Sequence, residues 1–175
     1  MARPTTPDLS LTEWVVLALV AESPTHGFAI SKLLRPDSDL GRVLTVHRPL
    51  VYRALDRLAD HDLIEPAQVE PGDGGPQRTV NRATRRGKAL VTRWLDSPVE
   101  HVRDLRIEFL VKLRLNQRRG RDAHQLVTAQ RAALAPTFDG LTQPPTADVV
   151  DRWRHRNALA ARQFLDDLLL GQSDG

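Results

Sequence analysis

An arginine-rich helix face is the part of the sequence best suited to chemistry. The stretch 48–57 places Arg48, Tyr52, Arg53 and Arg57 opposite an apolar stripe at helical spacing. The arginine fork suits guanine edges and phosphates, and a tyrosine hydroxyl suits a phosphate, so this face could lie in a DNA major groove. An ordinary solvated face, with aspartates 56 and 60 as ion-pair partners, fits equally well. The helix alone leaves the two interpretations even.

A predicted β-hairpin follows this helix directly. Residues 63–69 read as a strand, the Gly- and Pro-rich run 71–76 as a turn, and residues 77–82 as a cationic return strand. A two-stranded hairpin is barely stable alone, so it must pack on the helices. A helix followed by such a ribbon is typical of a winged helix-turn-helix, whose wing touches phosphates or the adjacent minor groove. The hairpin therefore favours the interpretation that the arginine-rich helix binds DNA.

The sequence has no pattern for catalysis, metal binding or cofactor binding. It contains no cysteine, which excludes disulfides, thiol catalysis and cysteine-based metal sites. Phosphate-loop and nucleophile-elbow motifs are absent, and the carboxylates are dispersed among arginines. We therefore expect a protein that is not an enzyme and holds no cofactor or metal. The histidines lack metal-ligand spacing and are expected at the surface or at helix caps: His26, His47, His61, His101, His124 and His155.

Length and charge set further bounds. A chain of 175 residues can form a small domain with a helical extension. The net charge is only +3 and the isoelectric point is about 9.9. Arginine dominates lysine, which suits phosphate recognition, although an arginine-rich proteome would explain it equally well. No apolar run has the length of a secretion signal or a membrane span, so we expect a cytoplasmic protein without a membrane partner.

The other expected helices frame the arginine-rich helix and the hairpin. Ser10 and Glu13 form a capping-box pattern at the first helix, and Gly27 would be explained by a close helix–helix approach. Ser97-Pro98 and the run 142–145 read as breaks. Helices are expected at about 10–22, 26–35, 49–61, 85–95, 101–116, 121–139 and 146–170. Residues expected to face inward on the second and third helices are Phe28, Ile30, Leu33, Leu34, Leu50, Val51, Ala54, Leu55 and Leu58.

The last expected helix carries an apolar seam near heptad spacing. The seam spans about three heptads, enough for a short coiled coil or another helix-packing face. Asn157 falls inside it, where it could fix the register between two helices or point outward; the sequence leaves both open. The residues predicted for dimerisation are Val150, Trp153, Asn157, Phe164 and Leu168, with Ala160 or Ala161 between them.

Four segments in this order resemble one family. They are LSLTEWVVLALVAESPTHGF (9–28), LVYRALDRLADHDLIEP (50–66), GDGGPQRTVNRATRRGKALVTRWL (72–95) and RIEFLVKLRL (106–115). The chain resembles the PadR family of bacterial transcriptional regulators through most of residues 9–115. The resemblance implies a mainly α fold, with a winged helix-turn-helix DNA-binding domain at 1–96 and a helical dimerisation domain at 97–175.

The resemblance also implies a function and its residues. It implies a homodimer that binds a pseudo-palindromic double-stranded DNA operator, acting as a repressor relieved by a small, often aromatic, effector. The helix at 49–61 would enter the major groove and the wing would meet the DNA backbone. The implied DNA-binding residues are Thr45, His47, Arg48, Tyr52, Arg53, Arg57, Gln77 and Arg78. The candidate walls of an effector pocket are Trp14, Trp94 and Trp153, although all three could equally be core or interface anchors.

Three positions depart from the family pattern, and two other functions stay open. His47-Arg48-Pro49 replaces the usual small segment before the tyrosine, which affects the operator sequence. Asp62 stands where a glycine is usual, and Asn81 where an aromatic is usual. A protein-interaction module that has lost DNA binding would also fit the modest charge and the acidic residues around the third helix. A MarR-like regulator would keep the function with another dimer geometry.

Overall fold

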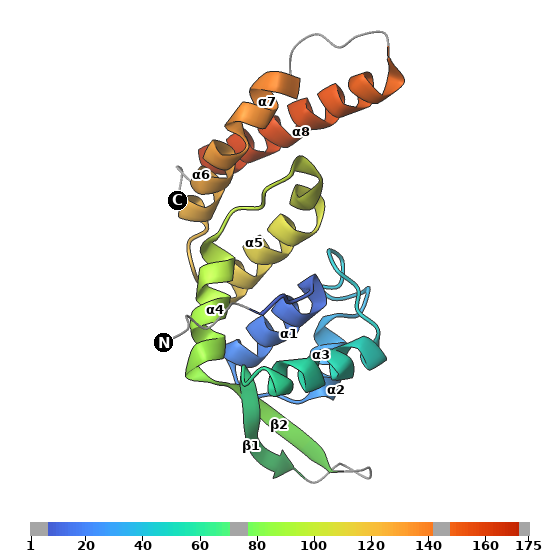
Figure 1. Ribbon diagram of the computed structural model, residues 1–175, viewed down its shortest axis with the longest axis vertical. Helices are drawn as coiled ribbons and strands as arrows, with labels where there is room; N and C mark the ends of the chain where they lie inside the picture. The colour runs from blue at the N-terminus through green and yellow to red at the C-terminus, as the bar shows by residue number, and fades with distance from the viewer. Residues whose placement is uncertain (1–6, 71–76, 142–147, 172–175) are drawn as a thin grey trace. The chain divides into compact units, whose positions relative to one another are not determined.

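The computed structural model describes residues 7–70, 77–141 and 148–171. Most of them are helical, and the chain divides into two compact units, Met1–Trp94 and Leu95–Gly175 (Figure 1). The expected turn at 71–76 and the expected break at 142–145 both lie outside these ranges. The two units are taken in turn.

The first unit begins with three helices, α1 (Leu11–Glu22), α2 (Gly27–Leu33) and α3 (Arg48–Asp60). The predicted capping box is confirmed: the Ser10 hydroxyl accepts from the Glu13 N–H at 3.4 Å, and the Glu13 carboxylate accepts from the Ser10 N–H at 2.7 Å. α1 is buried over residues 15–20, because it packs against α3 and the hairpin. It is the central helix of this unit.

The hairpin consists of β1 (Ile64–Glu70) and β2 (Arg78–Ala83), and α4 (Arg85–Asp96) follows it. The strands pair antiparallel, with an irregularity between Pro66 and Gln68. Asn81 also pairs with Thr25 through two backbone hydrogen bonds of 2.9 and 2.8 Å. This bridge attaches the hairpin to the segment between α1 and α2, while the hairpin extends away from the helices (Figure 1). The predicted winged helix-turn-helix is confirmed.

Two glycines are explained by close approaches, and Asp62 is explained by its backbone conformation. A Cβ on Gly27 would lie 3.0 Å from the Tyr52 ring, so the predicted approach of α2 and α3 is confirmed. A Cβ on Gly87 would lie 2.2 Å from the Leu63 carbonyl oxygen, which requires glycine where α4 meets the start of the wing. Asp62 has φ 56°, the left-handed conformation that favours glycine and that aspartate tolerates better than most residues.

The second unit contains η1 (Val102–Arg106), α5 (Glu108–Arg118), α6 (His124–Ala133), α7 (Ala135–Leu141) and α8 (Val149–Gly171). Two predicted helices are therefore wrong in extent. The stretch 101–116 changes from a 3₁₀ turn to an α-helix at Ile107, whose φ and ψ of −122° and −66° leave the helical region. The stretch 121–139 divides at Leu134, because Pro136 lacks the N–H needed inside one continuous helix.

The core of the second unit includes polar side chains with defined partners. Gln130 is fully buried and clamps the backbone of Val99, accepting its N–H at 2.7 Å and donating to its carbonyl at 2.9 Å. Lys112 is 1% exposed and pairs with Glu108 at 2.8 Å. Burial lowers the pKa of Lys112, and the hydrogen bond and charge of Glu108 oppose that shift. Gln130 fixes the start of the unit against α6, and Lys112, whose Nζ donates to the Ser97 carbonyl at 3.0 Å, fixes it against α5.

Candidate functional site

α3 presents a polar face to solvent, as its sequence predicts. Its inner face buries Val51, Ala54, Leu55 and Leu58. Leu50, expected inside, is 42% exposed and is a wrong prediction, because it lies in the first turn beyond the edge of the buried stripe. The exposed residues of α3 include Arg48, Tyr52, Arg53, Asp56 and Arg57.

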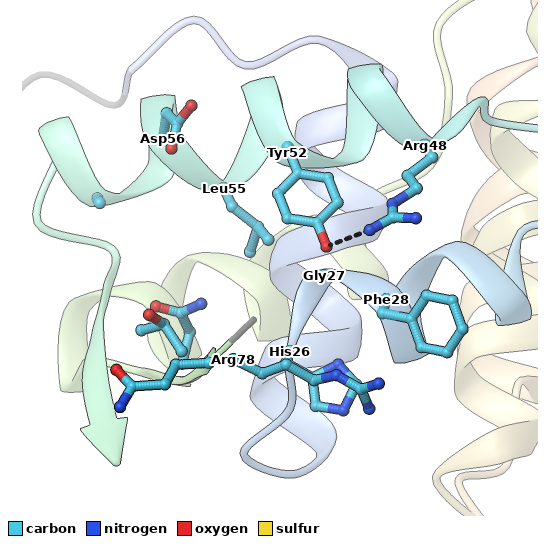
Figure 2. Close-up of a pocket in the computed structure, with 12 residues that line it drawn as sticks. His26, Gly27, Phe28, Arg48, Tyr52, Leu55, Asp56 and Arg78 are labelled. Carbon is cyan, nitrogen blue, oxygen red and sulfur yellow. Dashed lines mark hydrogen bonds between the residues drawn. The ribbon is translucent and has the colours of Figure 1, made fainter. Parts of the chain in front are cut away.

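Tyr52 and Arg48 are held in place at the start of α3. The Tyr52 ring lies over Gly27, and its hydroxyl lies 3.5 Å from Nη2 of Arg48 (Figure 2). The Arg48 guanidinium also lies 5.5 Å from the centre of the Tyr52 ring. A side chain restrained in this way loses less entropy when it binds a partner. Both groups therefore suit contacts with a ligand that approaches α3.

Arg57 has a different environment from the other arginines of α3. Its Nε lies 3.2 Å from Oε1 of Glu13, a carboxylate whose side chain is 7% exposed. The same carboxylate caps α1 through Ser10. Arg57 is thus the charge partner of a buried acid that joins α1 to α3. Its geometry favours a structural contribution over contact with DNA.

Thr45 and His47 lie in the segment that leads into α3. The Thr45 hydroxyl donates to the Gly41 carbonyl at 2.8 Å and so holds a turn. His47 occupies the N-cap of α3 without making a side-chain capping bond. Both are exposed and line one groove of about 270 Å³ together with Arg48.

The wing carries the other predicted contacts. Gln77 is exposed next to Arg78, the first residue of β2. Both line a groove of about 490 Å³ that α3 and the start of α2 also border, as Figure 2 shows for Arg48, Tyr52 and Arg78. Asp56 lines the same groove, farther along α3 than Tyr52 and Leu55 as seen from Arg48 (Figure 2). The structure therefore brings Arg48, Tyr52 and the wing residues together, and places Arg53 and Arg57 farther along α3.

The prediction that Phe28 lies in the core is wrong. Its side chain is only half-buried. Its ring lies 5.5 Å from the Arg48 guanidinium carbon, 5.1 Å from that of Arg78 and 4.7 Å from Lys32 Nζ. The spacing of Phe28 and Lys32 on one helix predicts their contact. No local sequence pattern predicts the contacts of Phe28 with Arg48 and Arg78.

The three tryptophans do not form one pocket. Trp14 and Trp94 stack on each other in the first unit, with ring centres 5.3 Å apart and planes 5° from parallel. Trp153 belongs to the second unit and is 69% exposed. It lines a groove of about 720 Å³ with Asn157 and Phe164. Of these three indoles, Trp153 therefore lines a groove in the described structure.

The apolar seam of α8 lies mainly on its open side. Val150, Trp153 and Phe164 are 49%, 69% and 38% exposed. Asn157 is half-buried in the same groove as Trp153, whereas Leu168 packs against the core of the second unit. The opposite face buries Ala158 and Leu165 in that core. α8 thus has one packed face and one apolar face that its own unit leaves exposed.

Two features are absent from the described residues. In the ranges 7–70, 77–141 and 148–171, no group of three or more histidine or acidic side chains could hold a metal ion. Within the same ranges, no helix combines the length and apolarity needed to cross a membrane.

Comparison with known proteins identifies the winged unit. Residues 16–93 match the model of the transcriptional regulator PadR-like family. Bacillus subtilis PadR in complex with operator DNA is similar in structure, with 16% identity, coverage of 96% of this chain and 97% of that chain, and a TM-score of 0.50. At that identity the likeness shows the fold alone.

Other comparisons are weaker. A PadR-like transcription factor from Bacteroides fragilis has 23% identity over 46% of this chain and 73% of its own, with a TM-score of 0.39. Bacillus subtilis PadR in complex with p-coumaric acid has 16% identity over 92% and 98%, with a TM-score of 0.45. Comparison with curated proteins found no match. Residues 16–93, the winged-helix part of this chain, are thus similar to the transcriptional regulator PadR-like family.

Proposed function

We propose that this protein is a dimeric, sequence-specific DNA-binding transcriptional regulator. One observation carries the proposal: the exposed face of α3, with Arg48 and Tyr52, continues onto the wing at Arg78 within one groove. In this arrangement α3 enters the major groove, where Arg53 contacts bases, while Arg48 and Tyr52 contact the DNA backbone. Gln77 and Arg78 contact the backbone beside it. Such a regulator acts in the cytoplasm, where the chromosome lies.

Dimerisation would set the spacing between the two DNA-binding helices. Two copies would place their α3 helices about 34 Å apart, one turn of DNA, and so read a pseudo-palindrome. The open apolar face of α8 supports residues 97–175 as the dimerisation domain, with residues 1–96 binding DNA. The contacts are assigned to Val150, Trp153, Asn157 and Phe164, while Leu168 supports the helix from its core side. A Trp153→Ala/Phe164→Ala variant should shift toward monomer in sedimentation, and an unchanged dimer would contradict the assignment.

We further propose that the protein is a repressor and that a small aromatic effector releases it from operator DNA. The groove beside Trp153 and Phe164 supports this, because its volume and aromatic walls suit a small ligand and it borders the proposed dimer contact. The Trp14–Trp94 pair is instead assigned to packing, since each indole already covers the other. Operator release on addition of p-coumaric acid, the ligand of the Bacillus subtilis complex, can be measured directly.

The DNA-binding assignment is tested by gel retardation on the protein's own promoter. Affinity should fall steeply with salt, because phosphate contacts release counterions. Arg53→Ala should weaken specific binding by about 1–3 kcal/mol if Arg53 reads a base, whereas Arg48→Ala should weaken binding to all DNA sequences alike. A Lys88→Ala/Arg93→Ala variant changes charge equally on the exposed face of α4 and serves as the control. Unchanged binding in the Arg48→Ala/Arg53→Ala variant would remove α3 from this function.

Asp56 favours the second candidate function, a protein-interaction module. This carboxylate lines the part of the groove that lies away from Arg48, where it would repel a nearby phosphate (Figure 2). Selection of bound sites from random DNA decides between the two. Enrichment of a two-fold symmetric site supports the regulator, and no enrichment at low salt supports the interaction module.

A further inference from the structure

The ring of Phe28 is the meeting point of cations from three elements. Lys32 comes from α2, Arg48 from α3 and Arg78 from β2. Their charged groups lie 4.7, 5.5 and 5.1 Å from the centre of the ring. Each distance is within the range in which a cation is attracted to an aromatic ring. One side chain thus links the start of α3 to the wing.

The fold supplies these cations with no carboxylate partner among the described residues. Nearby arginines differ in this respect, since Arg57 pairs with Glu13 at 3.2 Å and Arg82 pairs with Glu65 at 2.8 Å. Three like charges around one ring repel each other, and cation–π attraction offsets only part of that repulsion. Excess positive charge at a fixed point is suited to an anion.

Contact with an aromatic ring also leaves the donors of a guanidinium available. Arginine can stack through its plane and still use its in-plane N–H groups for a phosphate. The groove of about 490 Å³ gives access to both arginines and to Phe28 (Figure 2). Both guanidinium groups therefore keep N–H donors that a phosphate can use without displacing the ring.

We propose that Phe28 is a positioning residue that holds Arg48 and Arg78 as a joint site for one DNA backbone phosphate, with Lys32 adding charge. The proposal rests on the DNA-binding function and adds a residue and a contact to it. The site lies at the boundary between recognition helix and wing, so it fixes how far the wing stands from α3 on the duplex. Because it binds a phosphate, it changes affinity for all DNA sequences alike.

The test compares Phe28→Leu with Phe28→Tyr. Leucine keeps apolar bulk but has no ring, whereas tyrosine restores the ring. Phe28→Leu should weaken operator and nonspecific binding by similar factors, roughly tenfold, because both arginines must then be ordered on binding. Phe28→Tyr should bind within about twofold of the wild type. Arg78→Ala should lower the slope of log DNA affinity against log salt concentration by about one phosphate contact. The decrease should be smaller when Phe28→Leu is also present.

A second readout needs neither DNA nor a change of stability. In NMR spectra, the Nε–H signals of Arg48 and Arg78 should carry a ring-current shift that Phe28→Leu abolishes and Phe28→Tyr keeps. Millimolar inorganic phosphate should move both signals in the wild type far more than in Phe28→Leu. Equal phosphate responses, or a Phe28→Leu protein that binds DNA as the wild type does, would overturn the proposal. Wild-type protein that responds to phosphate but retards no DNA would overturn the DNA-binding function and leave the phosphate site supported.

Discussion

Removing Arg57 should destabilise the first unit more than it weakens DNA binding. The Glu13 side chain is 7% exposed, and the Arg57 side chain is 51% exposed. Loss of one partner of a fully buried ion pair costs about 3–5 kcal/mol, whereas an exposed pair contributes less than about 1 kcal/mol. Since one partner is buried and the other half-exposed, we expect Arg57→Ala to lower the free energy of unfolding by about 2 kcal/mol.

Urea denaturation followed by tryptophan fluorescence measures this change. Trp14 and Trp94 report on the first unit, and a Trp153→Phe background removes the indole of the second unit. Adding Glu13→Gln to Arg57→Ala should restore most of the loss, because a neutral amide can keep the bond to the Ser10 N–H without an unpaired charge. Wild-type stability in Arg57→Ala, together with a tenfold loss of operator affinity, would show that Arg57 contacts DNA and refute this reasoning.

Three further outcomes follow from single contacts. Gly87→Ala should lower the unfolding free energy of the first unit by at least about 2 kcal/mol in urea, since its Cβ would meet the Leu63 carbonyl oxygen at 2.2 Å. Gln130→Leu should cost the second unit about 2–4 kcal/mol by calorimetry, because it leaves the buried N–H and carbonyl of Val99 unpaired. Burial depresses the pKa of Lys112 in the folded protein, so the unfolded chain binds more protons just below 10.5. The wild type should therefore gain stability relative to Lys112→Met as the pH rises toward 10.5, and a pH-independent difference would contradict that cause.

The winged fold could be predicted because its signals are local. Helical spacing, a capping box and a Gly- and Pro-rich turn each specify one element, and their order specifies the arrangement. Gly27 alone predicts the close approach of two helices, and the structure identifies Tyr52 as its neighbour. The helix boundaries in the second unit were harder, because the apolar pattern continues through Ile107 and Leu134 although the backbone does not.

The candidate site was less predictable, because its contacts join distant residues. The sequence shows that Arg48 and Arg57 both lie outside the apolar stripe of their helix, but not that Glu13 lies beside Arg57. It shows an aromatic at position 28 on an apolar face, but not that Arg48 and Arg78 converge on its ring. Such contacts depend on how α1, α2 and the wing pack, and hydrophobic periodicity does not report the direction of side chains at the edge of a core.

The irregular register near Pro66 also affects how the protein behaves at high concentration. In the described part of the chain, β2 lies between β1 and Thr25, so β1 is the outer strand. Proline has no N–H to donate, and the register shift between Pro66 and Gln68 interrupts the regular ladder. A strand from another chain therefore finds a poor template there. This edge protects the wing against strand-to-strand aggregation while it stays exposed to solvent.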